Sequence, residues 1–197
     1  MSAQVATKAP TPGRDYGYGN ARVRGMRSRL LTAHYFDELM CHTDISKIIG
    51  MLIQTGYGPD IETAIIHGRT PAAMDEALRA NMVENFQKVM GFLNAEAHTL
   101  VGTLLGRWDM FNVKSIIRGK HMHLKPEEIE DGLYAVGALT PTDLHVLVGL
   151  EDIRAVVDTL VTWESPYAVP LRENLAAYGE GGNLATLELA LDRYYFS

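Results

Sequence analysis

The sequence predicts an all-α fold of about ten helices, a helical bundle built from two related small domains. Three observations favour this fold. Apolar residues recur at intervals of three and four in most segments, and strand-like alternation with β-branched residues is nearly absent. Many of the periodic segments begin after Thr or Asp and end at Gly, as helices commonly do. The composition, with 47% apolar and 21% charged residues, is that of a globular protein.

The first predicted helix covers residues 18–31 and continues into residues 32–40, because no strong helix breaker lies between them. A second helix is expected over residues 44–56. Asp44 is its candidate N-cap and Gly56 its candidate end. Its apolar residues share one face, and they are Ile45, Ile48, Ile49 and Leu52.

A short helix over residues 61–68 precedes a much longer helical stretch. Thr70 and Pro71 mark the start of that stretch, since Thr is a good N-cap and Pro fits the first helical position. Another helix is expected to end at Gly119. The apolar period of the long stretch runs through Met74, Ala77, Leu78, Met82, Val83, Phe86, Val89 and Met90.

The second half of the chain continues in the same way. Residues 125–139 begin with acids in the first turn, and residues 140–150 begin with Thr-Pro. Residues 151–163 and 184–196 are amphipathic. These four segments complete the predicted set of helices.

A weak internal repeat supports the division into two domains. Residues 44–61 match residues 151–171 when a short gap is allowed, and a longer helix follows each copy, at 74–86 and 187–196. A period near 110 residues is too long for a solenoid unit and suits a duplicated small domain. The paired positions are Asp44 with Asp152, Ile45 with Ile153, Tyr57 with Tyr167, Ile61 with Leu171, and Ala77-Leu78 with Ala190-Leu191.

The predicted organisation is a flexible lead-in over residues 1–13, a first helical domain over 14–120 and a second over 121–197. The lead-in lacks the apolar core of a signal peptide. No apolar run reaches the 18 or so residues that span a bilayer, so no direct membrane span is expected. Cys41 is the one cysteine, which excludes a disulfide framework and fits a reducing compartment.

Charge is distributed unevenly along the chain. Residues 1–30 hold six Lys/Arg against the single acid Asp15 and so carry +5; the remainder, by difference from the net charge of −6, carries −11. A general nucleic-acid-binding protein is usually basic across its working face, so an acidic body argues against that class. A basic patch that meets an acidic protein partner stays compatible with this distribution.

The glycines near the start raise the possibility of a phosphate-binding loop. Gly17 and Gly19 form a G-x-G pair, but Arg22 stands where the dinucleotide fingerprint needs its third glycine. The preceding residues do not form a buried strand, and the chain has no G-K-[ST] sequence. Nucleotide binding at this segment is therefore not favoured.

Four arginines follow these glycines, at positions 22, 24, 27 and 29. If residues 18–40 form one helix, Arg22 and Arg29 lie on one side of an apolar stripe and Arg24 and Arg27 on the other. One interpretation is a solvated basic surface, and another is pairing with acids of this chain or of a partner. Nucleic acid is the least favoured partner. The stripe consists of Val23, Met26, Leu30 and Ala33.

No catalytic constellation emerges from the remaining residues. His121 and His123 could donate two metal ligands, but no third ligand lies at a recognisable spacing. Cys41 and His42 are neighbours and would point about 100° apart on a helix. Basic residues also gather near the end of the helix that closes at Gly119, where cations complement the helix dipole; they are Lys114, Arg118 and Lys120.

Three segments together resemble a known family, the C subunit of the A/V-type rotary ATPases, whose counterpart in the vacuolar enzyme is the d subunit. Residues 16–31 resemble its opening signature, residues 107–121 a second segment and residues 186–196 a recurrent tyrosine-rich helix. Ser115 stands where the family usually has threonine. The matching residues are Tyr16, Tyr18, Asn20, Ala21, Arg22, Val23, Arg24, Met26, Ser28, Arg29, Leu30, Leu31, Asp109, Asn112, Lys114, Arg118, Gly119, Glu188, Leu191, Asp192, Tyr194, Tyr195 and Phe196.

The resemblance implies an all-helical fold with three related small domains arranged as a funnel. This chain has room for about two of them. It also implies a mechanical, non-catalytic role without cofactors or metals: the family member caps the proteolipid ring on its cytoplasmic side, receives the central rotor shaft and transmits torque. We therefore expect a cytoplasmic protein, peripheral to the membrane, whose partners are the proteolipid ring and the shaft subunits. The candidate contact residues are Arg22, Arg24, Arg27, Arg29, Lys114 and Arg118.

Two alternatives stay open at this point. The first is a stand-alone all-α interaction module, derived from the same family, that binds a protein partner without the ring. The second is an enzyme or nucleotide-binding protein, for which the sequence offers no motif.

Overall fold

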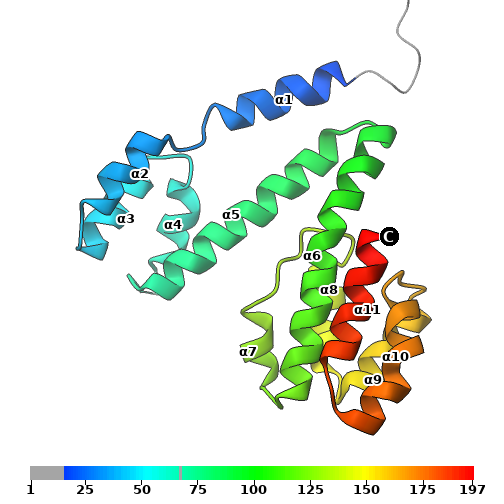
Figure 1. Ribbon diagram of the computed structural model, residues 1–197. Coiled ribbons are helices and arrows are strands. Elements are labelled where there is room, and N and C mark those ends of the chain that lie inside the picture. The colour runs from blue at the N-terminus through cyan, green and yellow to red at the C-terminus, as the bar shows by residue number, and fades with distance from the viewer. Residues whose placement is uncertain (1–15, 67) are drawn as a thin grey trace, which may run out of the picture. The chain divides into compact units, whose positions relative to one another are not determined.

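The computed structural model describes residues 16–66 and 68–197, and every regular element in these residues is an α-helix (Figure 1). The predicted all-α fold of about ten helices is confirmed. The predicted lead-in, residues 1–13, lies outside the described residues. The eleven helices are α1 (Gly17–Arg27), α2 (Ala33–Met40), α3 (Ile45–Ile53), α4 (Gly58–Ala64), α5 (Pro71–Phe92), α6 (Ala95–His121), α7 (Pro126–Glu130), α8 (Pro141–Gly149), α9 (Ile153–Thr162), α10 (Ala168–Gly181) and α11 (Ala185–Phe196).

The chain forms two compact units, and the boundary between them falls within α6. The first unit extends to Val101, and the second comprises Gly102–Ser197. The domains predicted from the sequence divide instead at residues 120 and 121, near the end of the same helix, and stay a prediction. In the described parts of both units, no helix is long and apolar enough to cross a membrane.

The expectation of one helix through residues 18–40 is wrong. α1 ends at Arg27, and α2 begins at Ala33 after Thr32, whose side chain accepts a hydrogen bond from the backbone N–H of Tyr35 at 3.2 Å. The hydroxyl of Ser28 donates a hydrogen bond to the carbonyl oxygen of Gly25, three residues earlier, at 2.9 Å. Hydroxyl side chains of this kind offer the backbone an alternative to continued helix. The expected stripe is therefore split between two helices.

The core of the first unit is small. It is built from α2 to α5, and the hydroxyl of Tyr35 on α2 also donates to the carbonyl of Met51 on α3 at 2.7 Å. No residue of α1 is buried. The buried cluster consists of Leu39, Ile49, Leu52, Ile61, Met74 and Ala77.

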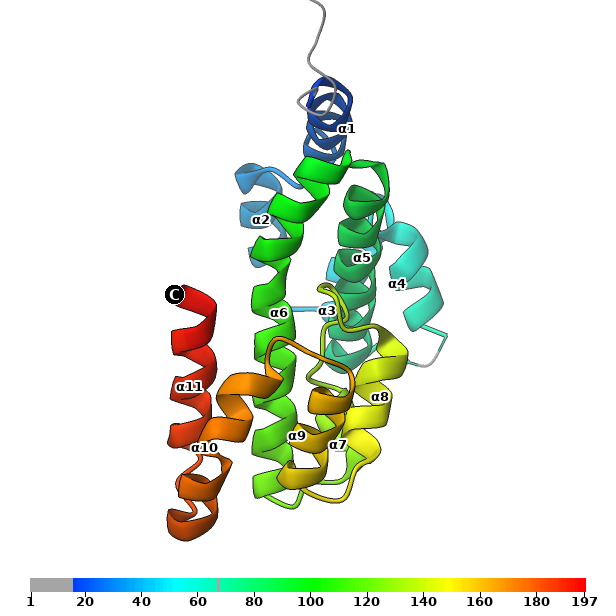
Figure 2. The same ribbon diagram turned by 90° about the vertical axis from the view of Figure 1, so that its right-hand side faces the viewer.

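The second unit has a larger core, organised around the C-terminal part of α6. Figure 2 shows α11 on one side of this helix and α8 with α9 on the other. Three apolar residues of α6 have 0% exposure, and they are Val113, Ile116 and Ile117. The rest of the cluster consists of Met110, Ile129, Leu139, Leu144, Leu147, Val148, Ile153, Val156, Val157, Leu160, Tyr167, Ala168, Leu171, Leu187 and Leu191.

Residues paired by the internal repeat hold corresponding places in the two units. Asp44 and Asp152 are the N-caps of α3 and α9, and each side chain accepts a backbone N–H of the first turn. Tyr57 and Tyr167 directly precede α4 and α10. One turn into those helices, Ile61 and Leu171 both have 0% exposure. The order α3–α4–α5 is thus repeated by α9–α10–α11.

Candidate functional site

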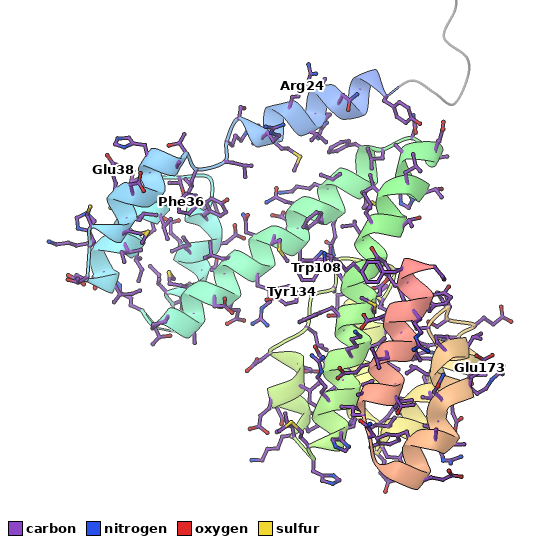
Figure 3. The ribbon with its side chains drawn as sticks, viewed as in Figure 1. Arg24, Phe36, Glu38, Trp108, Tyr134 and Glu173 are labelled. Atoms are coloured by element: carbon purple, nitrogen blue, oxygen red, sulfur yellow. The ribbon has the colours of Figure 1, made fainter. Side chains whose placement is uncertain are left out.

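The first group of candidate residues lies on and after α1, which contains no acid. Arg24 points away from α5 (Figure 3), and it is exposed, as are Arg27 and Arg29. These three arginines form no ion pair with any acid among the described residues. Pairing with an acid of the described chain is therefore not their role, and they form a solvated basic surface in this structure.

Arg22 differs from the other three arginines. Its guanidinium lies 4.9 Å from the ring centroid of Phe92 on α5 and 5.7 Å from that of Tyr18. One nitrogen also donates to the hydroxyl of Tyr18 at 3.0 Å. Such cation–π contacts contribute about 0.5–1 kcal/mol at exposed sites. Arg22 therefore fastens α1 to the end of α5.

The exposed arginines of α1 lie together, away from the side of the helix that packs against α5. At about 100° per residue, Asn20, Arg24 and Arg27 fall within one narrow sector, since they are four and three residues apart. All three are exposed. Gly19 lies on a different side of the helix, where a Cβ atom would lie 3.2 Å from Leu93 at the end of α5. α1 thus presents two guanidinium groups and an amide together on its outer side.

The second group, Lys114 and Arg118 on α6, is engaged within the second unit. The ammonium of Lys114 binds the carboxylate of Asp192 on α11 at 2.5 Å, and the Lys114 side chain is only 12% exposed. Arg118 forms two parallel hydrogen bonds to Glu188 on α11, at 2.5 and 2.9 Å. This bidentate pair raises the pKa of Arg118 and lowers the pKa of Glu188. Both basic side chains therefore hold α11 against α6.

Lys120 completes this pattern on the last turn of α6. Its ammonium donates to the carbonyl oxygen of Val148 at 2.5 Å and also to that of Leu150. Burial lowers the pKa of Lys120. The lysine therefore binds the carboxyl end of α8, a specific contact beyond simple complementarity to the dipole of its own helix.

Two polar residues of α6 whose contacts the sequence did not reveal are among the most buried in the described chain. Asp109 is 1% exposed and accepts the backbone N–H groups of Ala138 at 2.7 Å and Leu139 at 3.1 Å. Burial raises the pKa of Asp109, and these two hydrogen bonds oppose the rise. Asn112 is 0% exposed and exchanges two hydrogen bonds with the backbone of Tyr134, at 2.7 and 2.9 Å. Both side chains anchor the loop before α8, and polar residues three apart on an otherwise apolar helix face are the signal for such a role.

The structure adds no catalytic arrangement in the residues that it describes. No three of their His, Cys, Asp and Glu side chains converge as metal ligands would. His121 contacts the hydroxyl of Tyr178 at 2.8 Å. Gly17 and Gly19 lie inside α1 instead of in a loop that follows a strand.

Comparison with known proteins gives a consistent family. Residues 19–197 match the family described as the ATP synthase (C/AC39) subunit. The C subunit of the V-type ATP synthase from Deinococcus radiodurans is 30% identical over 182 residues, which cover 92% of this chain and 52% of that protein. The C subunit of the A-type ATP synthase from Methanosarcina acetivorans is 28% identical over 183 residues, 93% of this chain and 49% of that protein.

A third relative extends the range of organisms. The C subunit of the A-type ATP synthase from Methanocaldococcus jannaschii is 27% identical over 180 residues, which cover 91% of this chain and 45% of that protein. The chain thus spans about half the length of the relatives that it matches.

Proposed function

Because this chain belongs to the ATP synthase (C/AC39) subunit family, we propose that it is a non-catalytic part of the central stalk of an A/V-type rotary ATPase. In this role it links the rotor shaft to the membrane proteolipid ring and transmits torque for ion transport coupled to ATP hydrolysis or synthesis. It needs no cofactor for this function. Its place is on the cytoplasmic side, where its partners hold it at the membrane.

The exposed arginines on and directly after α1 are the observation that supports a protein-binding role most directly. Arg24, Arg27 and Arg29 have no acidic partner among the described residues, although the chain as a whole is acidic. A patch of one sign accelerates and orients association with a surface of the opposite sign. Guanidinium groups also bind carboxylates in a fixed, bidentate geometry, which suits a contact that must resist sliding under torque.

The six candidate contact residues then divide into two roles. Arg24, Arg27 and Arg29 are the direct contacts to an acidic surface of the shaft or the ring. Arg22, Lys114 and Arg118 act through the fold: Arg22 fixes α1 to α5, and the other two fix α11 to α6. Torque applied to α1 can be transmitted through the chain only if such attachments hold the helices in place.

The test is capture of rotary ATPase subunits by the tagged chain from membranes of its source in mild detergent. Wild-type protein should retain the proteolipid ring and the shaft subunits. The variant Arg24→Glu/Arg27→Glu should retain at least about tenfold less of both, because each reversal turns an attraction into a repulsion. The difference in capture between wild type and this variant should be larger at low salt, where surface charges are screened least.

A matched control is the double variant Arg154→Glu/Arg172→Glu, which makes the same change in net charge at exposed positions of α9 and α10. It should capture as much as wild type, and helical circular dichroism should be unchanged in both variants. Wild-type protein that captures neither ring nor shaft would refute the central-stalk role. Capture of a different protein through α1 would support the stand-alone interaction module instead.

A further inference from the structure

A small aromatic cluster at the last residue of α5 holds α1 in place. The ring of Phe92 meets the ring of Tyr18 edge to face, with the two centroids 6.3 Å apart, and its centroid lies 4.9 Å from the guanidinium of Arg22. Arg22 also donates a hydrogen bond to the hydroxyl of Tyr18, one turn earlier in α1. These three side chains, Tyr18, Arg22 and Phe92, form a clasp between the two helices.

α1 has few reasons of its own to be helical. It contains 11 residues, and helices shorter than about 12–15 residues are marginal when isolated in water. Gly19 and Gly25 lie inside it, and glycine disfavours a helix more than any residue except proline. Val23 and Met26 on its packed side are only half-buried, and no residue of α1 is buried. The helix therefore depends on its contacts with α5 to stay folded.

The proposed partner contacts of α1 lie outside this clasp. Arg24 points away from α5 (Figure 3), and both Arg24 and Arg27 are exposed. In a helix these two residues are three apart and project together, whereas in an unfolded segment their spacing varies. A partner that binds both gains affinity when the helix already exists, because less conformational entropy is then lost on binding.

We propose that Phe92 is a positioning residue: the clasp keeps α1 folded, and the folded helix presents Arg24 and Arg27 to the partner. Opening of the clasp unfolds α1 and lowers the apparent affinity in proportion to the fraction of molecules in which α1 is folded. Partner binding and closure of the clasp therefore favour each other. The inference rests on the proposed function for the identity of the partner, whereas the folding of α1 is measurable without any partner.

Amide hydrogen exchange in the full chain tests the clasp directly. The reporters are the backbone N–H groups of residues 20–28, which donate hydrogen bonds within α1 or at its end. Phe92→Ala should lower their protection at least about tenfold, because the cation–π contact and the edge-to-face contact are lost together. Arg22→Gln removes the guanidinium alone and should lower the same protection about threefold.

Three controls accompany these variants. Phe92→Tyr keeps an aromatic ring at the end of α5 and should keep the protection of α1. Phe196→Ala removes an exposed phenylalanine from α11 and should leave α1 unchanged. The amides of α9, in the second unit, should stay protected in every variant, which shows that the rest of the chain is folded.

Capture of ring and shaft subunits measures the consequence for binding. Phe92→Ala should reduce capture in proportion to the fraction of folded α1 that exchange reports. Gly25→Ala, added to Phe92→Ala, should restore protection about fivefold and raise capture with it, because alanine favours the helix. A Cβ atom at Gly25 would meet no other part of the chain within 4 Å, so this rescue acts through the folding of α1. Gly25→Ala alone should capture as wild type does.

The possible results separate this inference from the proposed function. Unchanged protection of α1 in Phe92→Ala would overturn the role of the clasp. Lower protection with unchanged capture would overturn the link between the folding of α1 and binding. If the wild-type chain captures neither ring nor shaft, the proposed function fails, and exchange still decides whether Phe92 keeps α1 folded.

Discussion

Four side chains of α6, from Asp109 to Arg118, fasten two different pieces of the second unit to this helix. Asp109 and Asn112 hold the loop before α8, and Lys114 and Arg118 hold α11. Every one of these groups is polar or charged, and each of their partners is far away in the sequence. Removing one partner of such a pair leaves the other without its hydrogen bonds, which costs more than the pair itself contributes. A segment of α6 that resembles the family is thus the segment on which the second unit is assembled.

The pair of Arg118 and Glu188 allows a quantitative test of this bracing. Arg118→Gln, Glu188→Gln and the double variant form a mutant cycle, and the coupling energy from urea denaturation should be about 0.5–1 kcal/mol at neutral pH. The value is modest because the Arg118 side chain is 50% exposed. The bidentate geometry of the pair places this coupling energy toward the upper end of the range for surface ion pairs.

The coupling should also depend on pH with a definite sign. Hydrogen bonds from Arg118 lower the pKa of Glu188, so the folded state binds this proton less tightly than the unfolded state does. The stabilisation is therefore complete above the ordinary carboxyl pKa of 4.5 and is lost as pH falls through the lower folded value. A coupling energy that stayed unchanged well below pH 4 would contradict the assigned pair.

At the scale of helices, the close approach of neighbouring segments is as important as the ion pairs and hydrogen bonds between them. A Cβ atom at Gly119 of α6 would overlap the side chain of Ile129 on α7, which is buried. One at Gly137 would overlap the carboxylate of Asp109, which caps the loop at that point. Both glycines therefore lie where two segments touch without room for a side chain.

Gly119→Ala should destabilise the protein by about 1–3 kcal/mol, because the added methyl group overpacks the contact between α6 and α7. Ile129→Ala removes the atoms that the methyl group would strike, so adding Gly119→Ala to it should cost little more than Ile129→Ala alone. Gly50→Ala is the control: a Cβ atom added there, inside α3, would meet no other part of the chain within 4 Å, and this change should stabilise by about 0.5–1 kcal/mol. Urea denaturation measures all four variants, and equal effects at positions 119 and 50 would contradict the packing argument.

Helix starts were easier to predict from the sequence than helix interruptions. Asp44, Thr70 and Thr140 precede periodic apolar residues, and each caps the expected helix with a side-chain hydrogen bond. The break at residues 28–32 was missed because no Gly or Pro marks it, and Thr32 starts the next helix in the middle of a continuing pattern. Asn94 similarly separates α5 from α6 by accepting the N–H of Ala97 at 2.8 Å.

The candidate site was predictable in composition but not in contacts. The arginines of α1 and the cations of α6 are visible in the sequence as two groups of basic residues. Their roles differ because the acids that bind Lys114 and Arg118 lie 78 and 70 residues further along the chain. A local pattern carries no information on such distant partners, whereas the fold brings them within hydrogen-bonding distance.

At the scale of the whole molecule, the two units carry cores of very different size. The buried cluster of the second unit contains eighteen residues, against six in the first. Since apolar burial is the main source of stability, the described part of the first unit has less to hold it together. The internal repeat allows equivalent residues of the two cores to be compared. Leu52 of α3 and Leu160 of α9 lie at the same distance after their capping aspartates, and they are 8% and 0% exposed.

We therefore expect the first unit to unfold at a lower urea concentration than the second. Both tryptophans, Trp108 and Trp163, lie in the second unit, so fluorescence reports that unit alone while circular dichroism reports helices of both. The circular dichroism signal should begin to fall before the fluorescence changes. Leu52→Ala should shift only the earlier transition, whereas Leu160→Ala should shift the later one and cost more within the usual range of about 2–5 kcal/mol. The two transitions could instead coincide and be shifted equally by either variant. That result would mean that each unit unfolds only with the other, so that the long helix α6 couples them into one cooperative structure.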